Sequence, residues 1–156
     1  MTTIAEARDR IFEQFDAFWA AQVVARSILT DVPYVVYQNV PFDPEKDVRN
    51  WPQPHATVEV QHVAGGIASL GGSSRRFRRE GFVAIEVNTL KGDKDSQGGT
   101  VLNDQLTQVA MDAFDGVHLT GNIWFQDVFP VETGPDDKGQ FFTTVVTAEF
   151  TYDEIK

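Results

Sequence analysis

The chain has 156 residues, is 42% hydrophobic and carries a formal net charge of −10, which predicts one globular domain that buries about two-thirds of its surface. It contains no cysteine, which excludes disulfides and thiolate zinc sites. The acidic balance opposes nucleic-acid binding by the whole chain, and no apolar run approaches the roughly 20 residues that cross a bilayer, so no membrane partner is expected.

Residues 4–24 are predicted to form an amphipathic helix, because apolar side chains recur there at helical spacing. Thr3 or Thr2 is expected to cap this helix, with Glu6 in its first turn. We expect the stripe to face the core. Its members are Ile4, Ile11, Phe12, Phe15, Phe18, Trp19 and Val23.

A short strand is predicted at residues 34–37, and a polar loop follows as far as Pro54. The prolines of this loop are expected to exclude regular structure. Trp51 lies in the loop and needs cover for its large apolar ring. Two interpretations remain open: Trp51 folds back on its own core, or it anchors a neighbouring subunit.

The next segment is predicted to be a long antiparallel hairpin. Residues 56–63 alternate between apolar and polar side chains, and residues 76–89 suit a half-buried strand. The connection at residues 65–74 contains Gly65, Gly66, Gly71 and Gly72 and exceeds the usual length of a hairpin loop. We therefore expect a long flexible loop with a functional role.

Residues 100–114 are predicted to form the second helix, after a polar linker over residues 91–99. Thr100 is expected to cap this helix and Gly116 to end it.

Two further strands are predicted at residues 123–131 and 141–152, and a short extra strand at residues 117–119 remains an option. The order of elements predicts a single α+β domain over residues 1–156. Its largely antiparallel or mixed sheet has four to five strands, and two helices pack on it.

No constellation of residues indicates catalysis. The three histidines stand in no metal-binding spacing, and neither a phosphate-binding loop nor a nucleophile elbow is present. We therefore predict that the protein is not an enzyme and has no catalytic residue, cofactor or metal.

Four arginines lie within five positions: Arg75, Arg76, Arg78 and Arg79. Three interpretations remain open: contact with phosphates of passing DNA, salt bridges to acidic residues of a neighbouring subunit, or a solvated strand end that is partly paired within the chain. With Trp51 and the four loop glycines, these arginines are the candidates for inter-subunit or lumen-facing residues.

In its order of features, the sequence resembles the tail terminator (tail completion) proteins of long-tailed bacteriophages. An Asn-Val-Pro-Phe step occupies residues 39–42, and the glycine loop leads into Arg-Arg-Phe-Arg-Arg-Glu-Gly at residues 75–81. The chain closes with Phe-Thr-Tyr-Asp-Glu at residues 150–154, like the Phe-x-Tyr-Asp-Glu endings common in that family.

The resemblance implies a structural role in the virion, after assembly in the host cytoplasm. Such proteins form a ring, typically a hexamer, on the head-proximal end of the tail tube. The ring stops tube polymerisation and offers a surface to the head-completion protein, and DNA passes transiently through its lumen. The alternatives are another head-tail connector or completion subunit, and a DNA-binding module that uses the arginines at residues 75–79.

Overall fold

The computed structural model describes residues 2–49, 51–69, 75–91 and 99–155. The elements in chain order are α1 (Ile4–Ala25), β1 (Tyr34–Tyr37), α2 (Pro44–Asp47), β2 (His55–Ser69), β3 (Arg76–Leu90), α3 (Thr100–Asp112), β4 (His118–Leu119), β5 (Ile123–Pro135) and β6 (Phe141–Ile155). The strands form one six-stranded sheet in the order β1-β2-β3-β6-β5-β4. β1 pairs with β2 in parallel, and the other neighbours pair antiparallel, so the sheet is mixed.

The α+β class is confirmed, but the predicted counts of four to five strands and two helices are too low. The described residues form six strands and three helices. The additional helix, α2, begins at Pro44 with Asp43 as its N-cap, although the prolines of this segment were expected to exclude regular structure. Proline is in fact favoured in the first turn of a helix, because the N–H that it lacks has no helical partner there.

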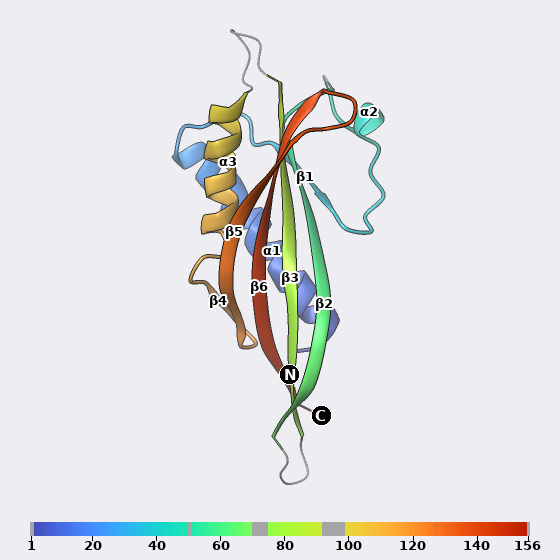
Figure 1. The fold of residues 1–156 in the computed structure, drawn as a ribbon, viewed down its shortest axis with the longest axis vertical. Coiled ribbons are helices and arrows are strands. Elements are labelled where there is room, and N and C mark those ends of the chain that lie inside the picture. The colour runs from blue at the N-terminus through green and yellow to red at the C-terminus, as the bar shows by residue number, and fades with distance from the viewer. Residues whose placement is uncertain (1, 50, 70–74, 92–98, 156) are drawn as a thin grey trace.

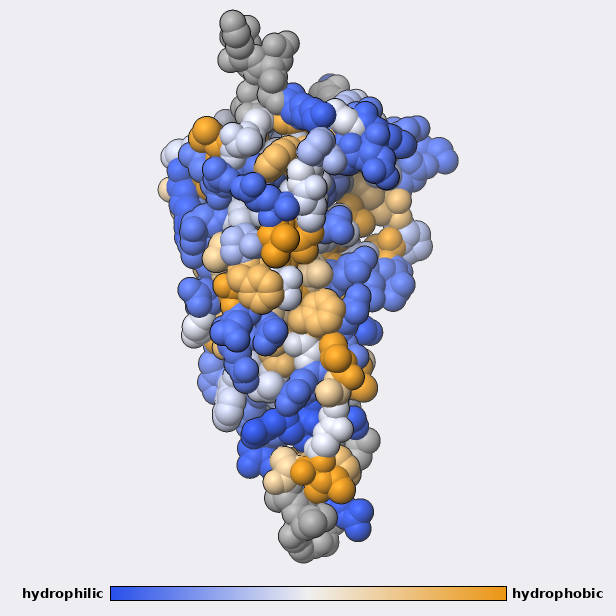
Figure 2. Space-filling model, viewed as in Figure 1, coloured by the Kyte–Doolittle hydropathy of each residue, from blue (hydrophilic) through white to orange (hydrophobic). Residues whose placement is uncertain are grey.

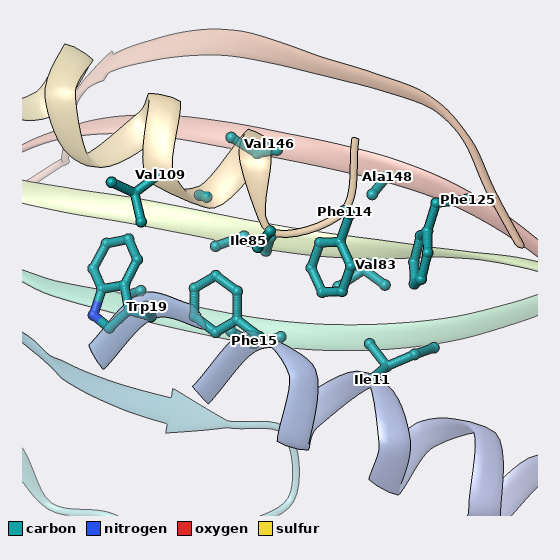
Figure 3. Packing of buried hydrophobic residues seen from close by; sticks show 14 of the residues in the cluster. Ile11, Phe15, Trp19, Val83, Ile85, Val109, Phe114, Phe125, Val146 and Ala148 are labelled. Atoms are coloured by element: carbon teal, nitrogen blue, oxygen red, sulfur yellow. The ribbon is translucent and has the colours of Figure 1, made fainter. Parts of the chain in front are cut away.

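Both long helices lie on one face of the sheet, and the core fills the space between them and the strands (Figure 1). Figure 3 shows Phe15 and Trp19 of α1 directed toward Phe114 and Val109, above Ile85 of β3. The Phe15 ring stacks on Trp19 at 5.3 Å and on Phe114 at 6.2 Å between centroids. The buried stripe of α1 takes every fourth residue: Ala7, Ile11, Phe15, Trp19 and Val23.

The ends of α1 and α3 agree only in part with the ends that the sequence predicted. Thr3 caps α1 and forms a reciprocal capping box with Glu6, as predicted. Ile4 was expected in the core stripe but is 43% exposed, because it lies beyond the end of that stripe. At α3 the prediction of Thr100 as cap is wrong: Gly99 is the N-cap and offers no side-chain hydrogen bond. α3 ends at Asp112 with Ala113 as its C-cap, so Gly116, which was predicted to end the helix, lies three residues beyond that cap, with a φ of 67°.

The β2–β3 hairpin continues past the start of α1 (Figure 1). We call this part the distal hairpin and define it as residues 64–69 of β2 and 76–80 of β3. The end of β6 pairs with it, from Thr151 opposite Glu80 to Ile155 opposite Arg76. A three-stranded arm therefore projects from the helix-covered body.

Candidate assembly surfaces

Arg76 and Arg78 form ion pairs with one acidic residue of their own chain. Arg78 lies opposite Asp153 in the register of β3 and β6, and its Nε is 3.3 Å from the Asp153 carboxylate. Arg76 bonds the other oxygen of the same carboxylate. Asp153 thus joins the two arginines on one face of the arm.

Arg79 lies on the opposite face and has a different partner. Its Nε and Nη2 donate to Glu154 at 3.0 and 2.9 Å, and the Glu154 carboxylate is nearly buried. The guanidinium also lies 5.9 Å from the centre of the Phe77 ring. It crosses Gly65 so closely that a Cβ there would lie 2.6 Å from Nη1. Gly65 is therefore needed for this path of the Arg79 side chain.

These pairs bear on the three interpretations of the arginine cluster. Arg76, Arg78 and Arg79 are each bonded within the chain, but Arg76 and Arg78 share the carboxylate of Asp153, so these pairs offset only part of their charge. Arg75 is exposed and makes no ion pair with any described residue. Contact of these arginines with DNA or with another subunit stays a prediction, and Arg75 is the member best placed for it.

The glycines divide into two groups. Gly65 and Gly66 were expected in a loop, but they belong to β2 and lie opposite Arg79 and Arg78. The prediction failed because strand pairing with β3 overrides the flexibility of glycine, and a bulge after His62 lets the register continue. Gly71 and Gly72, with the second half of the expected flexible loop (residues 70–74), lie outside the described residues.

Trp51 packs against its own chain. Its ring lies 5.9 Å from His55 and 5.5 Å from Phe141, and the residue is half-buried. This contact agrees with the interpretation that Trp51 folds back on the core, and its role as an inter-subunit anchor stays a prediction. His55 begins β2 and the distal hairpin ends it, roughly 45 Å away at strand spacing, so Trp51 and the arginines do not form one site.

The face of the sheet opposite α1 and α3 is covered by neither of these long helices, and we call it the open face. Apolar side chains follow one another across its strands, and Figure 2 shows them gathered along the middle of this face between hydrophilic borders. Trp124, Phe129 and Val131 of β5 are 42–50% exposed. Val145 of β6 and Phe82 of β3 are half-buried beside them. An exposed apolar stripe of this kind is a candidate surface for contact with protein.

The open face also carries unpaired acids. Burial, and then the charge of Glu59 on the neighbouring strand, raise the pKa of Glu86 above its ordinary value. The two carboxylates repel each other across β2 and β3, and the described residues place no cation between them. The open face is therefore both apolar and electronegative.

His62 belongs to a polar cluster at the edge of the core, on the helix-covered side. Its ring meets Tyr152 edge-on at 5.9 Å. Both ring nitrogens, Arg8 Nε and Tyr152 Oη are buried and have no hydrogen-bond partner among the described residues. Burial, followed by the charges of Arg8 and Arg79, lowers the pKa of His62 below its ordinary value of 6.5. The imidazole is therefore neutral at pH 7.

His62→Gln is expected to make the protein less sensitive to acid. The pKa of His62 is lower in the folded than in the unfolded state, so the unfolded state takes up the proton first and stability falls as the pH drops below 6.5. The loss is about a few tenths of a kcal/mol, because water screens this half-buried group. Burial also lowers the pKa of His55, so part of the acid sensitivity should remain.

Urea unfolding at pH 7.5 and pH 5.5 measures this difference. Equal pH dependence in the parent and in His62→Gln would contradict the assignment.

The described part of the chain shows neither a cluster of metal ligands nor a membrane-spanning helix. It contains no group of three His, Cys, Asp or Glu side chains placed to hold a metal ion. None of its helices combines the length and the apolar character required to cross a membrane.

Comparison with known proteins extends the description of the fold. No protein-family model and no curated protein sequence matches the chain. A solved structure described only by a sequence label superposes with a TM-score of 0.57 at 15% identity, over 92% of this chain and 94% of that chain. A chain from the virion of a native gene transfer agent particle superposes with a TM-score of 0.47 at 13% identity, over 94% of this chain and 93% of that chain. The first likeness shows a shared fold along nearly the whole chain; the second superposition is looser, and the function proposed below does not rest on it.

Proposed function

We propose that this chain is a non-enzymatic virion subunit that forms a ring on the head-proximal end of a phage tail tube. The ring stops tube polymerisation, meets the head-completion protein and lets DNA pass through its lumen. The observation that carries this proposal is the open face, an apolar and electronegative sheet surface on which large apolar side chains stay exposed among the described residues. A subunit that leaves such a face bare gains stability by assembling.

The resemblance to tail terminator proteins supports the specific form of assembly. Its two most distinctive motifs, residues 75–81 and 150–154, are far apart in the sequence but pair with each other on β3 and β6. The acids of the second motif, Asp153 and Glu154, hold the arginines of the first. The motifs therefore work as one structural unit, the projecting arm.

The charge of the chain suits a conduit for DNA. Each copy has a formal net charge of −10, so a ring of copies is strongly acidic and repels the phosphate backbone. DNA would slide through such a lumen without being held. The intramolecular ion pairs of Arg76, Arg78 and Arg79 also occupy these guanidinium groups, which weighs against the DNA-binding alternative.

Light scattering coupled to size exclusion, with negative-stain imaging, tests the proposal. We expect the purified protein, alone or mixed with tail tubes, to give closed rings with a central hole. On tubes the rings should sit at one end only, and growth from that end should stop. Protein that stays monomeric and leaves tube growth unchanged at every concentration would contradict the proposal.

A further inference from the structure

The open face is hollowed where β2, β3, β6 and β5 pass side by side. The hollow has a volume of about 360 Å³. Its lining includes Phe82, Glu80, Glu149 and Gln126. Glu149 lies directly opposite Phe82 in the strand register, and Glu80 precedes Phe82 by two residues on β3, so both acids neighbour the ring on one face.

The two carboxylates of this hollow have no cation of their own. Glu80 and Glu149 are exposed and form no ion pair with a described residue. The arginines nearest to them on the same face, Arg76 and Arg78, are held by Asp153. Two unpaired acids on either side of an aromatic ring are suited to a guanidinium, which stacks on the ring and donates to both carboxylates.

The end of the arm carries a group that complements these two carboxylates. Arg75 precedes β3 at the end of the arm and is the exposed arginine of the cluster that lacks an ion pair with any described residue. Ile67 lies opposite Phe77 on the helix side of the arm and is 53% exposed, because the arm extends beyond α1. We call Arg75 and Ile67 together the tip. The tip combines a cation that pairs with no described residue and an uncovered apolar side chain.

We propose that the tip of one copy docks in the hollow of the next, with Arg75 between Glu80 and Glu149 and Ile67 against Phe82. This inference rests on the proposed ring and names its two contact surfaces. The helix side of one arm meets the open face of another copy, so the two surfaces differ and the contact is heterologous. Heterologous contacts close into a ring when their rotation permits.

Charge reversal gives the first test. Arg75→Glu and Glu149→Arg should each lower the fraction of protein in rings by about ten-fold or more, because each leaves like charges at a partly buried contact. Mixing the two variants should restore rings, since each tip then finds a hollow of opposite charge; the double variant should behave the same way. Lys138→Glu and Glu45→Arg make matched charge changes on exposed residues elsewhere and should have no effect.

Cysteine cross-linking gives the second test, and the natural absence of cysteine keeps its background low. A mixture of Arg75→Cys and Glu149→Cys should give covalent dimers under mild oxidation, and the double-cysteine variant should give a ladder that ends in a closed ring. The pair Lys138→Cys and Glu149→Cys should give none.

The outcomes separate the docking contact from the ring. Cross-links in open oligomers, with no ring under any condition, would support the docking contact and overturn the proposed ring. Rings that form without cross-links and tolerate both charge reversals would overturn the docking contact and leave the proposed function standing. Absence of both assembly and cross-links would overturn both.

Discussion

Gly81→Ala is expected to lower the free energy of unfolding by about 3 kcal/mol, although it adds only one methyl group. A Cβ at this position would lie 2.3 Å from the backbone oxygen of Gln61 and 2.6 Å from the ring of Phe150. The Gln61 oxygen cannot retreat without disturbing the β2–β3 pairing, in which Gln61 and His62 lie opposite Phe82 and Gly81. The Phe150 ring is 1% exposed and packs against Phe125 and Tyr152, so it has little room to move.

Gly66→Ala is the matched control for this substitution. Gly66 is also a glycine of the hairpin, but no atom lies within 4 Å of the position that its Cβ would take. We expect a change of less than about 0.5 kcal/mol, because alanine also restricts the unfolded chain. Urea unfolding followed by circular dichroism measures both variants. Similar midpoints for Gly81→Ala and the parent would show that β2 and β3 separate more easily than the packing indicates.

Local patterns predicted the body of the fold. The spacing of apolar residues located α1 within one residue at its C-terminal end and located the N-terminal residue of α3, and alternation located the central strands. These signals are local because each periodicity comes from one element that presents one face to the core. The short β4, kept as an option over residues 117–119, is confirmed at residues 118–119.

The distal hairpin shows where local patterns fail. Gly65 and Gly66 have weak strand propensity, and only their pairing with Arg79 and Arg78 makes them part of β2. Likewise, the residues near Arg79 in the sequence do not identify Glu154 as its partner, since 75 residues separate the two. The available signal was the joint presence of a basic motif and an acidic motif on two strands of matching length. The two motifs predict specific ion pairs only when the register of β3 and β6 is known.

The open face could be predicted only in outline. Alternation in β3 and β6 indicates that one face of the sheet, the open face, is less apolar than the other. The bulge between Phe125 and Val128 decides which residues of β5 lie on the open face. With this bulge, Phe129 and Val131 lie on the open face and the hollow forms beside Gln126. Bulges arise from pairing over the whole sheet, so a single sequence does not locate them.

Substitution of a buried asparagine, which the sequence analysis did not single out, should destabilise the fold as much as substitution of Gly81. Asn103 of α3 is fully buried, and its Nδ2 donates to the backbone oxygens of Val87 and Phe142, each at 3.1 Å. Its Oδ1 accepts from the hydroxyls of Thr144 at 2.6 Å and Thr107 at 3.3 Å. One side chain thus joins α3 to both central strands, β3 and β6.

Asn103→Leu is expected to lower the free energy of unfolding by about 3 kcal/mol or more. Leucine has a similar volume, so the main loss is the hydrogen bonds, and the hydroxyl of Thr144 would be left buried without its acceptor. Thr144→Val removes a single donor and should cost only about 1 kcal/mol. Gln108→Leu, on the exposed side of the same helix, should change stability by less than about 0.5 kcal/mol.

Denaturant unfolding of the three variants tests this ordering. If Asn103→Leu is no more destabilising than Gln108→Leu, the network does not hold α3 on the sheet. If the ordering is as expected, a polar side chain fixes how α3 sits on β3 and β6.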